Sequence, residues 1–540
     1  MTQASSSATA GDRPRGSTRQ AGQTWAVTKP QVSSAGGIVV AQHHEAARAG
    51  ADVLARGGNA MDAAVVTACV LSVVEPWLSG FGGGGFLLHA AAEGPVEALD
   101  FNVVAGSAVD PADYPLVGDR DGDWFDWPAV EGNRNLIGPA SICVPGAVAG
   151  LAAALERHGT LSWADALAPA IEMAERGMRV DWFADLAFAI DTPGLRTNPA
   201  ARALFLDPDA RRCDPEDATA RYLPMPVKAA MLRRLAEAGP RDFYEGQIGR
   251  DLARDLATMG APVTARDLAA CAPAWSAPAT MTYRDRQLHV MDGLSGGPSL
   301  LRALGLLPDD IAGLTPAARA AAYADAIRDT YEDRLKTLGH AAAGGDCTSH
   351  LSVVDRHGNM VALTNTLLSR FGSKVVAPSL GLLMNNGMMW FDPRPGQPNS
   401  IAPSARPLAN MTPLIATRDG RADIALGAAG GRQIFPTVLQ LLSYLVDLGM
   451  TPEAALHAPR IDASTPTIFV NRAAPADTAT AIAARHPVQI TEDAVWPVQF
   501  AIPSLAVSGR GQGPNTGAAH PVSPWAAAIA EPPATTGAAP

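Results

Sequence analysis

Residues 347–373 read CTSHLSVVDRHGNMVALTNTLLSRFGS, and this segment decides the fold of the chain. Two stretches in it, HLSVVD and NMVALTNTLL, alternate apolar and polar residues or are β-branched, which predicts two strands. The turn signal Arg356-His357-Gly358 stands between them. The preceding residues 341–346, AAAGGD, are small and are predicted to be flexible. The first strand is therefore expected to begin close to Thr348.

Thr348 occupies a position at which chain cleavage would create a new N-terminus. It stands at the start of a predicted strand, directly after a loop that is expected to be exposed. An N-terminal threonine supplies both nucleophile and base, because its free α-amine, with a pKa of about 7.7–8, can take the hydroxyl proton near neutral pH. Threonine at a strand start is also common for structural reasons, so the spacing alone leaves both interpretations open.

The chain before His340 shows mainly helical patterns with a few strands. Its apolar residues recur at helical spacing, and most of these segments are followed closely by glycine, which is common after helix ends. The predicted helices are residues 43–56, 61–74, 147–157, 163–176, 226–238, 246–259 and 316–338. After His340 come further strand patterns, KVVAP, GLLMNN and DIALGAAG, and then a helix pair at 436–447 and 452–457. This distribution predicts an α/β fold with helical layers packed over a sheet.

The composition is that of a globular protein with a large core. Of the 540 residues 47% are hydrophobic, and 42 Lys+Arg against 53 Asp+Glu give a net charge of −11. Because nucleic-acid affinity rests on clustered positive charge, nucleic acid is excluded as a partner. The longest apolar stretch, residues 63–74, is too short to cross a bilayer, so no membrane partner is expected. The five scattered cysteines predict neither a disulfide framework nor a metal site.

Both ends of the chain have the composition of disordered segments. Residues 1–30 are rich in Ser, Thr, Gly and Arg without an apolar period, which predicts a disordered arm. This arm has no apolar segment of the secretory type, so a cytoplasmic location is expected, with periplasmic export as the alternative left open. Residues 508–540 are rich in Gly, Pro and Ala and are mostly predicted to form a loose tail, although the beginning of this stretch could be a loop against the body.

Two glycine clusters each have two interpretations. Residues 80–85, GFGGGG, lack the Lys-Ser/Thr pair of a phosphate loop, so close backbone packing is favoured over nucleotide binding. Residues 427–432, GAAGGR, lie between a predicted strand and a predicted helix. Such a turn exposes unpaired N–H groups, as an oxyanion hole requires, but it also fits a turn that binds nothing. The run His43-His44-Glu45 is interpreted as a solvated helix face and not as a metal site.

Five segments together resemble one known family. They are GGNAMDAAVVTACVLSVVEPWLSGFGGGGF (57–86), CTSHLSVVDRHGNMVALTNTLLSRFGS (347–373), LLMNNGMMWFDPRPGQPNSI (382–401), RPLANMTPLI (406–415) and GAAGGRQ (427–433). The chain is similar to the γ-glutamyltranspeptidase family (γ-glutamyltransferases, glutathione hydrolases) of N-terminal-nucleophile hydrolases. The resemblance extends from about residue 30 to residue 500, with the motifs in the family order.

The resemblance implies a precursor that cleaves itself between Cys347 and Thr348. Residues 31–347 would then form a large subunit and residues 348–507 a small one. In the family the two subunits stay together in a four-layer αββα sandwich. The chain's own cleaved subunit is therefore an expected partner in a heterodimer.

The resemblance also assigns the catalytic roles. Thr348 is the implied nucleophile in both self-cleavage and turnover, and Thr366 is the implied hydrogen-bond partner of its hydroxyl. The backbone N–H groups of Gly430 and Gly431 are implied to hold the tetrahedral oxyanion. The implied reaction is acyl transfer through an acyl-Thr348 intermediate, and it involves no metal and no organic cofactor.

The chain departs from the family at residues implied to bind the substrate. The family arginine for the substrate α-carboxylate is replaced by Asn102, and the family aspartate for the α-ammonium by Trp390. Ala409 and Asn410 replace a serine pair, and Leu368 replaces an asparagine. Asparagine cannot form the bidentate charged pair of an arginine, so a zwitterionic γ-glutamyl group is expected to bind less tightly.

Three functions are compatible with these residues. The first is a self-cleaving amide hydrolase or acyltransferase that moves a γ-glutamyl-type acyl group from a glutathione-like small molecule to water or an amine. The alternative is an acylase for a less charged acyl amide, such as a glutaryl-type or secondary-metabolite amide, similar to cephalosporin acylases, with Trp390 lining an apolar pocket. An unprocessed, non-catalytic relative is disfavoured, because such a protein would not require the nucleophile and the glycine pair together.

Overall fold

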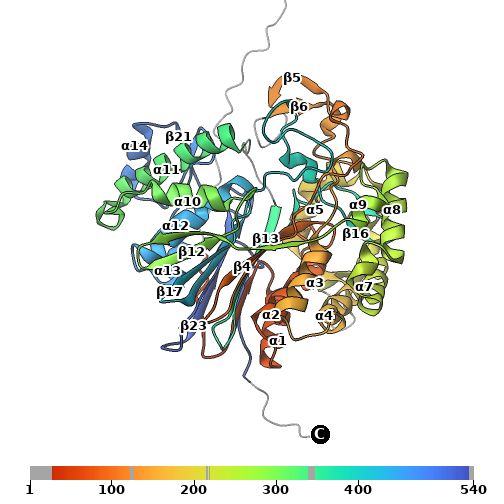
Figure 1. The fold of residues 1–540 in the computed structure, drawn as a ribbon, viewed down its shortest axis with the longest axis horizontal. Coiled ribbons are helices and arrows are strands. Elements are labelled where there is room, and N and C mark those ends of the chain that lie inside the picture. Colours follow the sequence, from red (N-terminus) through yellow and green to blue (C-terminus); the bar gives the residue numbers. More distant parts are fainter. Residues whose placement is uncertain (1–26, 122–126, 215–216, 218, 339–346, 534–540) are drawn as a thin grey trace, which may run out of the picture.

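The computed structural model describes residues 27–121, 127–214, 217, 219–338 and 347–533. Two seven-stranded antiparallel sheets lie face to face, with one group of helices outside each of them (Figure 1). We call them the β13 sheet, which contains the strand of Thr348, and the β18 sheet, which contains the strand before Gly430. The predicted α/β class is confirmed.

The β13 sheet has at its centre the hairpin encoded by residues 347–373. Its strand order is β10-β4-β3-β14-β13-β2-β24. The strands are β10 (Ala274–Ser276), β4 (Val96–Asp100), β3 (Gly84–Ala90), β14 (Met360–Leu368), β13 (Cys347–Val354), β2 (Ile38–Ala41) and β24 (Ala527–Ala530). Every residue of β14 is buried, because neighbouring strands flank it and other layers cover both faces.

The β18 sheet has the order β1-β23-β22-β18-β17-β12-β11. Its strands are β1 (Val32–Ser34), β23 (Asn515–Ala519), β22 (Ile502–Val507), β18 (Arg421–Ala429), β17 (Leu414–Arg418), β12 (Arg286–Val290) and β11 (Ala279–Tyr283). The short strands outside the two main sheets are β5 (Leu116–Asp121), β6 (Pro128–Val130), β7 (Met178–Arg179), β8 (Arg212–Cys213), β9 (Arg221–Leu223), β15 (Val376–Ala377), β16 (Leu382–Leu383), β19 (Ile461–Asp462), β20 (Ile468–Asn471) and β21 (Val488–Thr491).

Helices cover the outer faces of both sheets. On the β13 side lie α1 (His44–Ala55), α2 (Ala60–Val74), α3 (Ala147–His158), α4 (Trp163–Arg176), α5 (Trp182–Leu195), α6 (Pro199–Ala201), α7 (Pro226–Ala238), α8 (Gln247–Met259) and α9 (Ala265–Ala269). On the β18 side lie α10 (Gly297–Gly305), α11 (Pro316–Thr337), α12 (Ile434–Val446), α13 (Pro452–His457) and α14 (Ala476–Ala483). Helix α2 is buried along its whole length and begins at Asn59, whose side chain forms a capping box with Asp62.

Three hydrophobic clusters fill the spaces between these layers. Leu351 and Val353 of β13 face the cluster shared with α1 and α2, whereas Val354 faces the cluster between the two sheets. A third cluster joins the β18 sheet to α10, α11 and α12. The sheets approach closely at Gly427, where an added Cβ would lie 2.3 Å from the ring of His350. Glycine is therefore required at this position by the contact between the sheets.

The predicted helices are confirmed with small shifts at their ends, but α5, α6, α9, α10 and α14 were missed. The prediction of a loose tail over residues 508–540 is wrong where the structure describes it. β23 pairs with β22 and β1, and β24 pairs with β2, because small residues still supply the backbone N–H and C=O groups that a strand needs. Of the predicted N-terminal arm, residues 1–26 lie outside the described residues. Lys29 is held in place, and its Nζ donates to the carbonyl oxygen of Ala526 at 2.6 Å.

Candidate active site

The start of β13 brings the two predicted threonines to neighbouring positions. Thr348 pairs in register with Thr366 of β14, and Thr366 pairs in turn with Gly84 of β3. The ladder between β13 and β14 shifts register between Cys347 and Thr348, directly at the predicted cleavage site. The Thr366 hydroxyl is buried and accepts a hydrogen bond from the N–H of Leu368 at 2.8 Å. The preceding residues 344–346 lie outside the described residues.

The second predicted element is the glycine turn after β18. Gly430 has a φ of +140° and Gly431 a φ of +57°, and both values favour glycine. The turn leads into α12 through a short 3₁₀ segment, Gly431–Gln433. Neither glycine N–H donates a hydrogen bond to another residue of the described chain. Two free donors on a turn that tolerates only small residues are what an oxyanion site needs.

The glycine cluster at residues 80–85 brings β3 close to β14. An added Cβ at Gly83 would lie 2.0 Å from the carbonyl oxygen of Thr366, and one at Gly85 would lie 2.0 Å from that of Thr364. These backbone atoms cannot move aside without breaking the ladder. The interpretation as close backbone packing is therefore confirmed.

A buried histidine of β13, His350, places its ring between the two sheets near the start of this strand. The two ring nitrogens of His350 lie 2.9 Å from the Thr364 hydroxyl and 3.2 Å from the Ser352 hydroxyl. Burial lowers its pKa to about 3, so the ring is neutral at physiological pH. His350 therefore acts as a hydrogen-bonding spacer between the sheets and brings no charge to the site.

Sequence reasoning did not assign a role to Asn385 and Asn386, which tie the site together. Asn385 Oδ1 accepts from the N–H of Cys143 at 3.0 Å, and its Nδ2 donates to the carbonyl oxygen of Gly82 at 2.7 Å. Asn386 Oδ1 accepts from the N–H of Ser369 at 2.9 Å. A short polar pair inside an otherwise apolar run, LLMNNGMMW, was the signal that could have found them.

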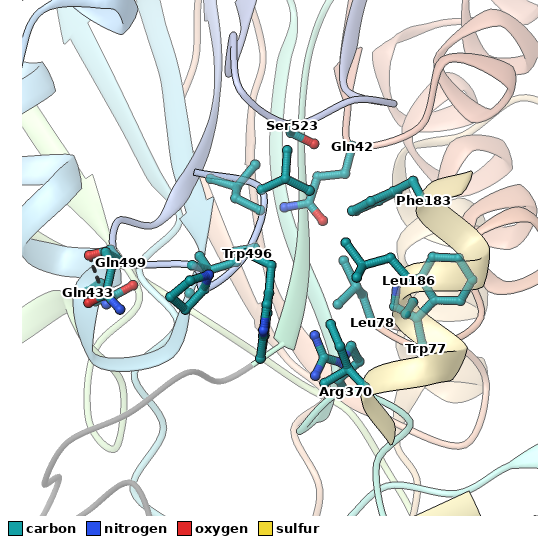
Figure 2. Close-up of a pocket in the computed structure, with 18 of the residues that line it drawn as sticks. Gln42, Trp77, Leu78, Phe183, Leu186, Arg370, Gln433, Trp496, Gln499 and Ser523 are labelled. Carbon is teal, nitrogen blue, oxygen red and sulfur yellow. Dashed lines mark hydrogen bonds between the residues drawn. The ribbon is translucent and has the colours of Figure 1, made fainter. Parts of the chain in front are cut away.

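A cavity of about 450 Å³, which we call the Gly430 cavity, opens beside the glycine turn (Figure 2). One wall is apolar and comes from α5 and the segment after α2, and Figure 2 shows Gln433 and Gln499 on the opposite side with Trp496 between. The apolar lining residues are Trp77, Leu78, Phe183, Leu186, Ala187, Ile190, Phe469, Val495, Trp496, Pro497, Val498 and Ile502. The sequence patterns did not predict this cavity.

The ionisable side chains that line the Gly430 cavity are either shifted toward the neutral form or held by an ion pair or hydrogen bonds. The Arg370 guanidinium donates to the Asp191 carboxylate and lies 4.5 Å from the centre of the Trp496 ring. Burial raises the pKa of Glu75 well above its ordinary value of 4.5. Asp462 accepts hydrogen bonds from the N–H and the hydroxyl of Ser464, at 3.1 Å and 2.9 Å.

The structure does not bring the predicted substrate residues into the Gly430 cavity. Asn102 lines a separate cavity of about 260 Å³ together with Arg406. Trp390 is buried in the cluster between the two sheets. Asn410 is also buried, and its Oδ1 accepts from Arg334 at 3.4 Å. Burial lowers the pKa of Arg334 to about 10.

Two groups of histidines lie outside the Gly430 cavity. His43 is buried and its Nδ1 accepts from the N–H of Glu45 at 3.1 Å, so the interpretation of His43 as part of a solvated face is wrong. His89, Glu97 and His158 come together from distant segments at distances that would suit a metal ion. However, His158 Nε2 lies 2.8 Å from Glu97, and the two imidazole rings are stacked with centres 3.9 Å apart. The His158 ring is therefore already engaged by Glu97 and by the His89 ring.

Helices of bilayer-spanning length and hydrophobicity are absent from the described part of the chain.

Comparison with known proteins identifies the family. Residues 46–345 and 311–500 match the family described as Gamma-glutamyltranspeptidase. The chain is 32% identical over 497 residues to the Acylase ACY 1 proenzyme of Pseudomonas sp. (strain SE83), covering 85% of this chain and 88% of the relative. It is 30% identical over 479 residues to the Glutathione hydrolase proenzyme of Escherichia coli (strain K12), covering 78% and 80%.

The fold is also that of a solved acylase. The crystal structure of cephalosporin acylase from Bacillus halodurans superposes with a TM-score of 0.81, covering 94% of this chain and 98% of that chain at 23% identity. The chain therefore belongs to the γ-glutamyltranspeptidase family. The predicted enzyme class, an N-terminal-nucleophile amide hydrolase or acyltransferase, is confirmed at the level of the family.

Proposed function

We propose that this chain cleaves itself between Cys347 and Thr348 and then acts on amides through an acyl-Thr348 intermediate. The α-amine of Thr348 takes the hydroxyl proton as the oxygen attacks the amide carbonyl. The N–H groups of Gly430 and Gly431 stabilise the tetrahedral oxyanion, and the proton passes to the leaving amine. Water or an acceptor amine then attacks the ester and releases Thr348.

The observation that carries this proposal is the arrangement of backbone positions. Thr348 stands opposite Thr366 at the end of its ladder, and the Gly430 turn with its two free N–H groups borders a cavity of substrate size. Such positions follow from strand register and turn geometry. They are therefore fixed by the fold before any substrate binds.

We further infer that two subunits form an αββα sandwich from the layers described above. β10, β4, β3 and β2 of the β13 sheet precede the cleavage site, whereas β14, β13 and β24 follow it. The β18 sheet is divided in the same way, with β1, β12 and β11 before the site. Antiparallel ladders such as β14–β3 and β13–β2 thus join the two pieces, and the heterodimer holds after cleavage. The small subunit includes β23 and β24 and therefore extends beyond residue 507.

Two acyl groups are candidates. A γ-glutamyl-type group, as the names of the glutathione hydrolase relatives indicate, would be transferred to water or an amine. A less charged acyl group is the second candidate, because Asn102 and Trp390 carry no charge and an acylase proenzyme is equally similar to this chain. Trp390 does not line the Gly430 cavity, so it would act through packing.

The test is denaturing electrophoresis with intact mass on the wild-type protein and on Thr348→Ala. The proposal expects fragments of roughly 36 and 20 kDa in the wild type only, with the small one beginning Thr-Ser-His. Hydrolysis of γ-glutamyl-p-nitroanilide and of a butyryl-p-nitroanilide then separates the two acyl candidates. A single intact chain in both proteins would refute the mechanism and favour a non-catalytic relative.

A further inference from the structure

The floor of the Gly430 cavity carries polar side chains that the proposed chemistry does not use. Gln42 follows β2, Glu75 follows α2, and both line the cavity while being almost fully buried, with 1% and 2% of their surface exposed. Ser349 lies next to Thr348 in β13 and is 1% exposed. We call Gln42 and Glu75 the polar floor.

The polar floor has unused hydrogen-bonding capacity. Both amide atoms of Gln42 and the Oε2 atom of Glu75 have no hydrogen-bond partner in the described part of the chain, whereas the Ser349 hydroxyl interacts with the Glu75 carboxyl. Figure 2 shows the Gln42 amide pointing into the cavity. Buried polar atoms are paired in nearly all folded proteins, and leaving several unpaired at one place is unfavourable. A group on a ligand would supply the missing partners.

The electrostatics of the cavity select against an anionic ligand group. Burial raises the pKa of Glu75 well above 4.5, and the nearby Ser349 hydroxyl only partly opposes this effect. The one guanidinium among the cavity-lining residues that the structure describes, Arg370, is committed to Asp191. A carboxylate that entered would lose its water and find no free positive charge to pair with.

The walls select for an apolar body. Trp77, Phe183 and Leu186 stand along one side of the cavity, and Trp496 faces them (Figure 2). A cavity of about 450 Å³ with aromatic walls suits a ring or a medium-length alkyl chain. An apolar body with one neutral polar end would therefore match both the walls and the floor.

We propose that the Gly430 cavity binds one half of the amide substrate, and that this half is an apolar, ring-containing group ending in a neutral hydrogen-bonding function such as a carboxamide. Glu75 and Gln42 receive that function and determine the specificity of the site. The identification of the ligand as one half of the substrate rests on the proposed function. The binding of such a ligand in the cavity does not.

Ligand binding to Thr348→Ala tests the proposal without any turnover. The probes are 4-phenylbutyramide, its carboxylate counterpart 4-phenylbutyrate, and L-glutamine, titrated at pH 7 by calorimetry. We expect the neutral amide to bind at least about tenfold more tightly than either charged probe. Equal or tighter binding of 4-phenylbutyrate or L-glutamine would overturn the proposal, and so would the absence of binding of the amide.

Substitutions in the same background locate the binding. Gln42→Leu and Glu75→Leu should each weaken binding of 4-phenylbutyramide about tenfold, whereas Glu75→Gln, which keeps a neutral hydrogen-bonding side chain, should stay within about threefold. The exposed Gln512→Leu is the matched control and should change nothing. If Glu75→Leu fails to fold, the affinities of Glu75→Gln and Gln42→Leu for 4-phenylbutyramide still test the proposal. Equal affinities of Gln42→Leu and Gln512→Leu for this amide would refute the assignment of Gln42 to the binding site. A wild type that binds the amide but remains uncleaved would contradict the proposed function alone.

Discussion

Substituting alanine for Gly430 tests the oxyanion site at a position where the structure defines the consequence. The residue has a φ of +140°, a region that side chains other than glycine rarely occupy, at a strain of about 1–3 kcal/mol. An added Cβ would also lie 2.7 Å from the Cα and 2.8 Å from the Cβ of Ala501, and neither atom can rotate away. The turn therefore has to move, and its two N–H groups move with it.

Loss of one well-placed oxyanion donor typically lowers kcat about 100- to 1,000-fold, so Gly430→Ala is expected to lower kcat by about 100-fold or more. Gly431→Ala is the matched control, because its φ of +57° lies in a region that alanine enters at about 1–2 kcal/mol. We expect the control to lose less activity. The assay is steady-state amide hydrolysis on protein whose self-cleavage has been checked by electrophoresis, together with thermal unfolding.

The decisive comparison is between activity and stability. If Gly430→Ala lowers the Tm but keeps kcat within about threefold of the wild type, the turn has moved without consequence and does not form the oxyanion site. If both variants lose activity equally, strain at the turn is not what governs catalysis.

Three further perturbations have expected outcomes. Glu75→Gln should raise the Tm relative to wild type, and this increase should be smallest near pH 4 and should grow as the pH rises above 4.5. The reason is that the raised pKa of Glu75 disfavours the carboxylate in the folded state, whereas the unfolded chain forms it in this pH range. A difference in Tm that stays constant from pH 4 to 8 would contradict this. Gly427→Ala should destabilise the fold by about 1–3 kcal/mol, since its Cβ would overlap the His350 ring, and an unchanged midpoint in urea unfolding would exclude this contact. Thr366→Val removes the hydroxyl beside Thr348 and should slow both self-cleavage and turnover about tenfold or more. Electrophoresis over time follows self-cleavage, and kcat follows turnover. Wild-type rates of both would show that Thr366 is not part of the site.

Local patterns were sufficient for the elements that carry strong periodicity or strong caps. Helix α2 is an example, because the polar cap at Asn59 and the apolar run after it define both its start and its burial. The hairpin of β13 and β14 was similarly evident from alternation around its turn. In both cases the deciding interactions lie within about 25 residues of sequence.

The elements that were missed depend on distant partners. Ala527–Ala530 has little apolar surface, and it becomes a strand because Ile38–Ala41 offers an unpaired edge at the other end of the chain. The Gly430 cavity poses the same difficulty, since its lining comes from α5 and from residues 495–499 as well as from the motifs. No pattern within one segment indicates which side chains of another segment will face it.

The catalytic and the substrate-binding predictions also differ in physical kind. Thr366 and Gly430 were located through motifs that describe backbone requirements, a ladder position and a turn that excludes side chains, and these requirements persist whatever the substrate is. The roles of Asn102, Trp390 and Asn410 were implied by the resemblance to the family, and no backbone constraint fixes their side chains.

Trp390 and Asn410 have packing and hydrogen-bonding roles elsewhere in the structure. The Trp390 side chain is buried between the sheets. The side-chain oxygen of Asn410 accepts a hydrogen bond from Arg334, and the Arg334 guanidinium also donates to the backbone oxygen of Ser295 at 2.9 Å. Substitutions that moved these positions into packing and hydrogen bonding would abolish a charged head-group site while leaving the Thr348 ladder and the glycine turn intact. If the chain acts as proposed, recognition depends on another surface next to the same N–H donors, and the Gly430 cavity is bordered by that turn.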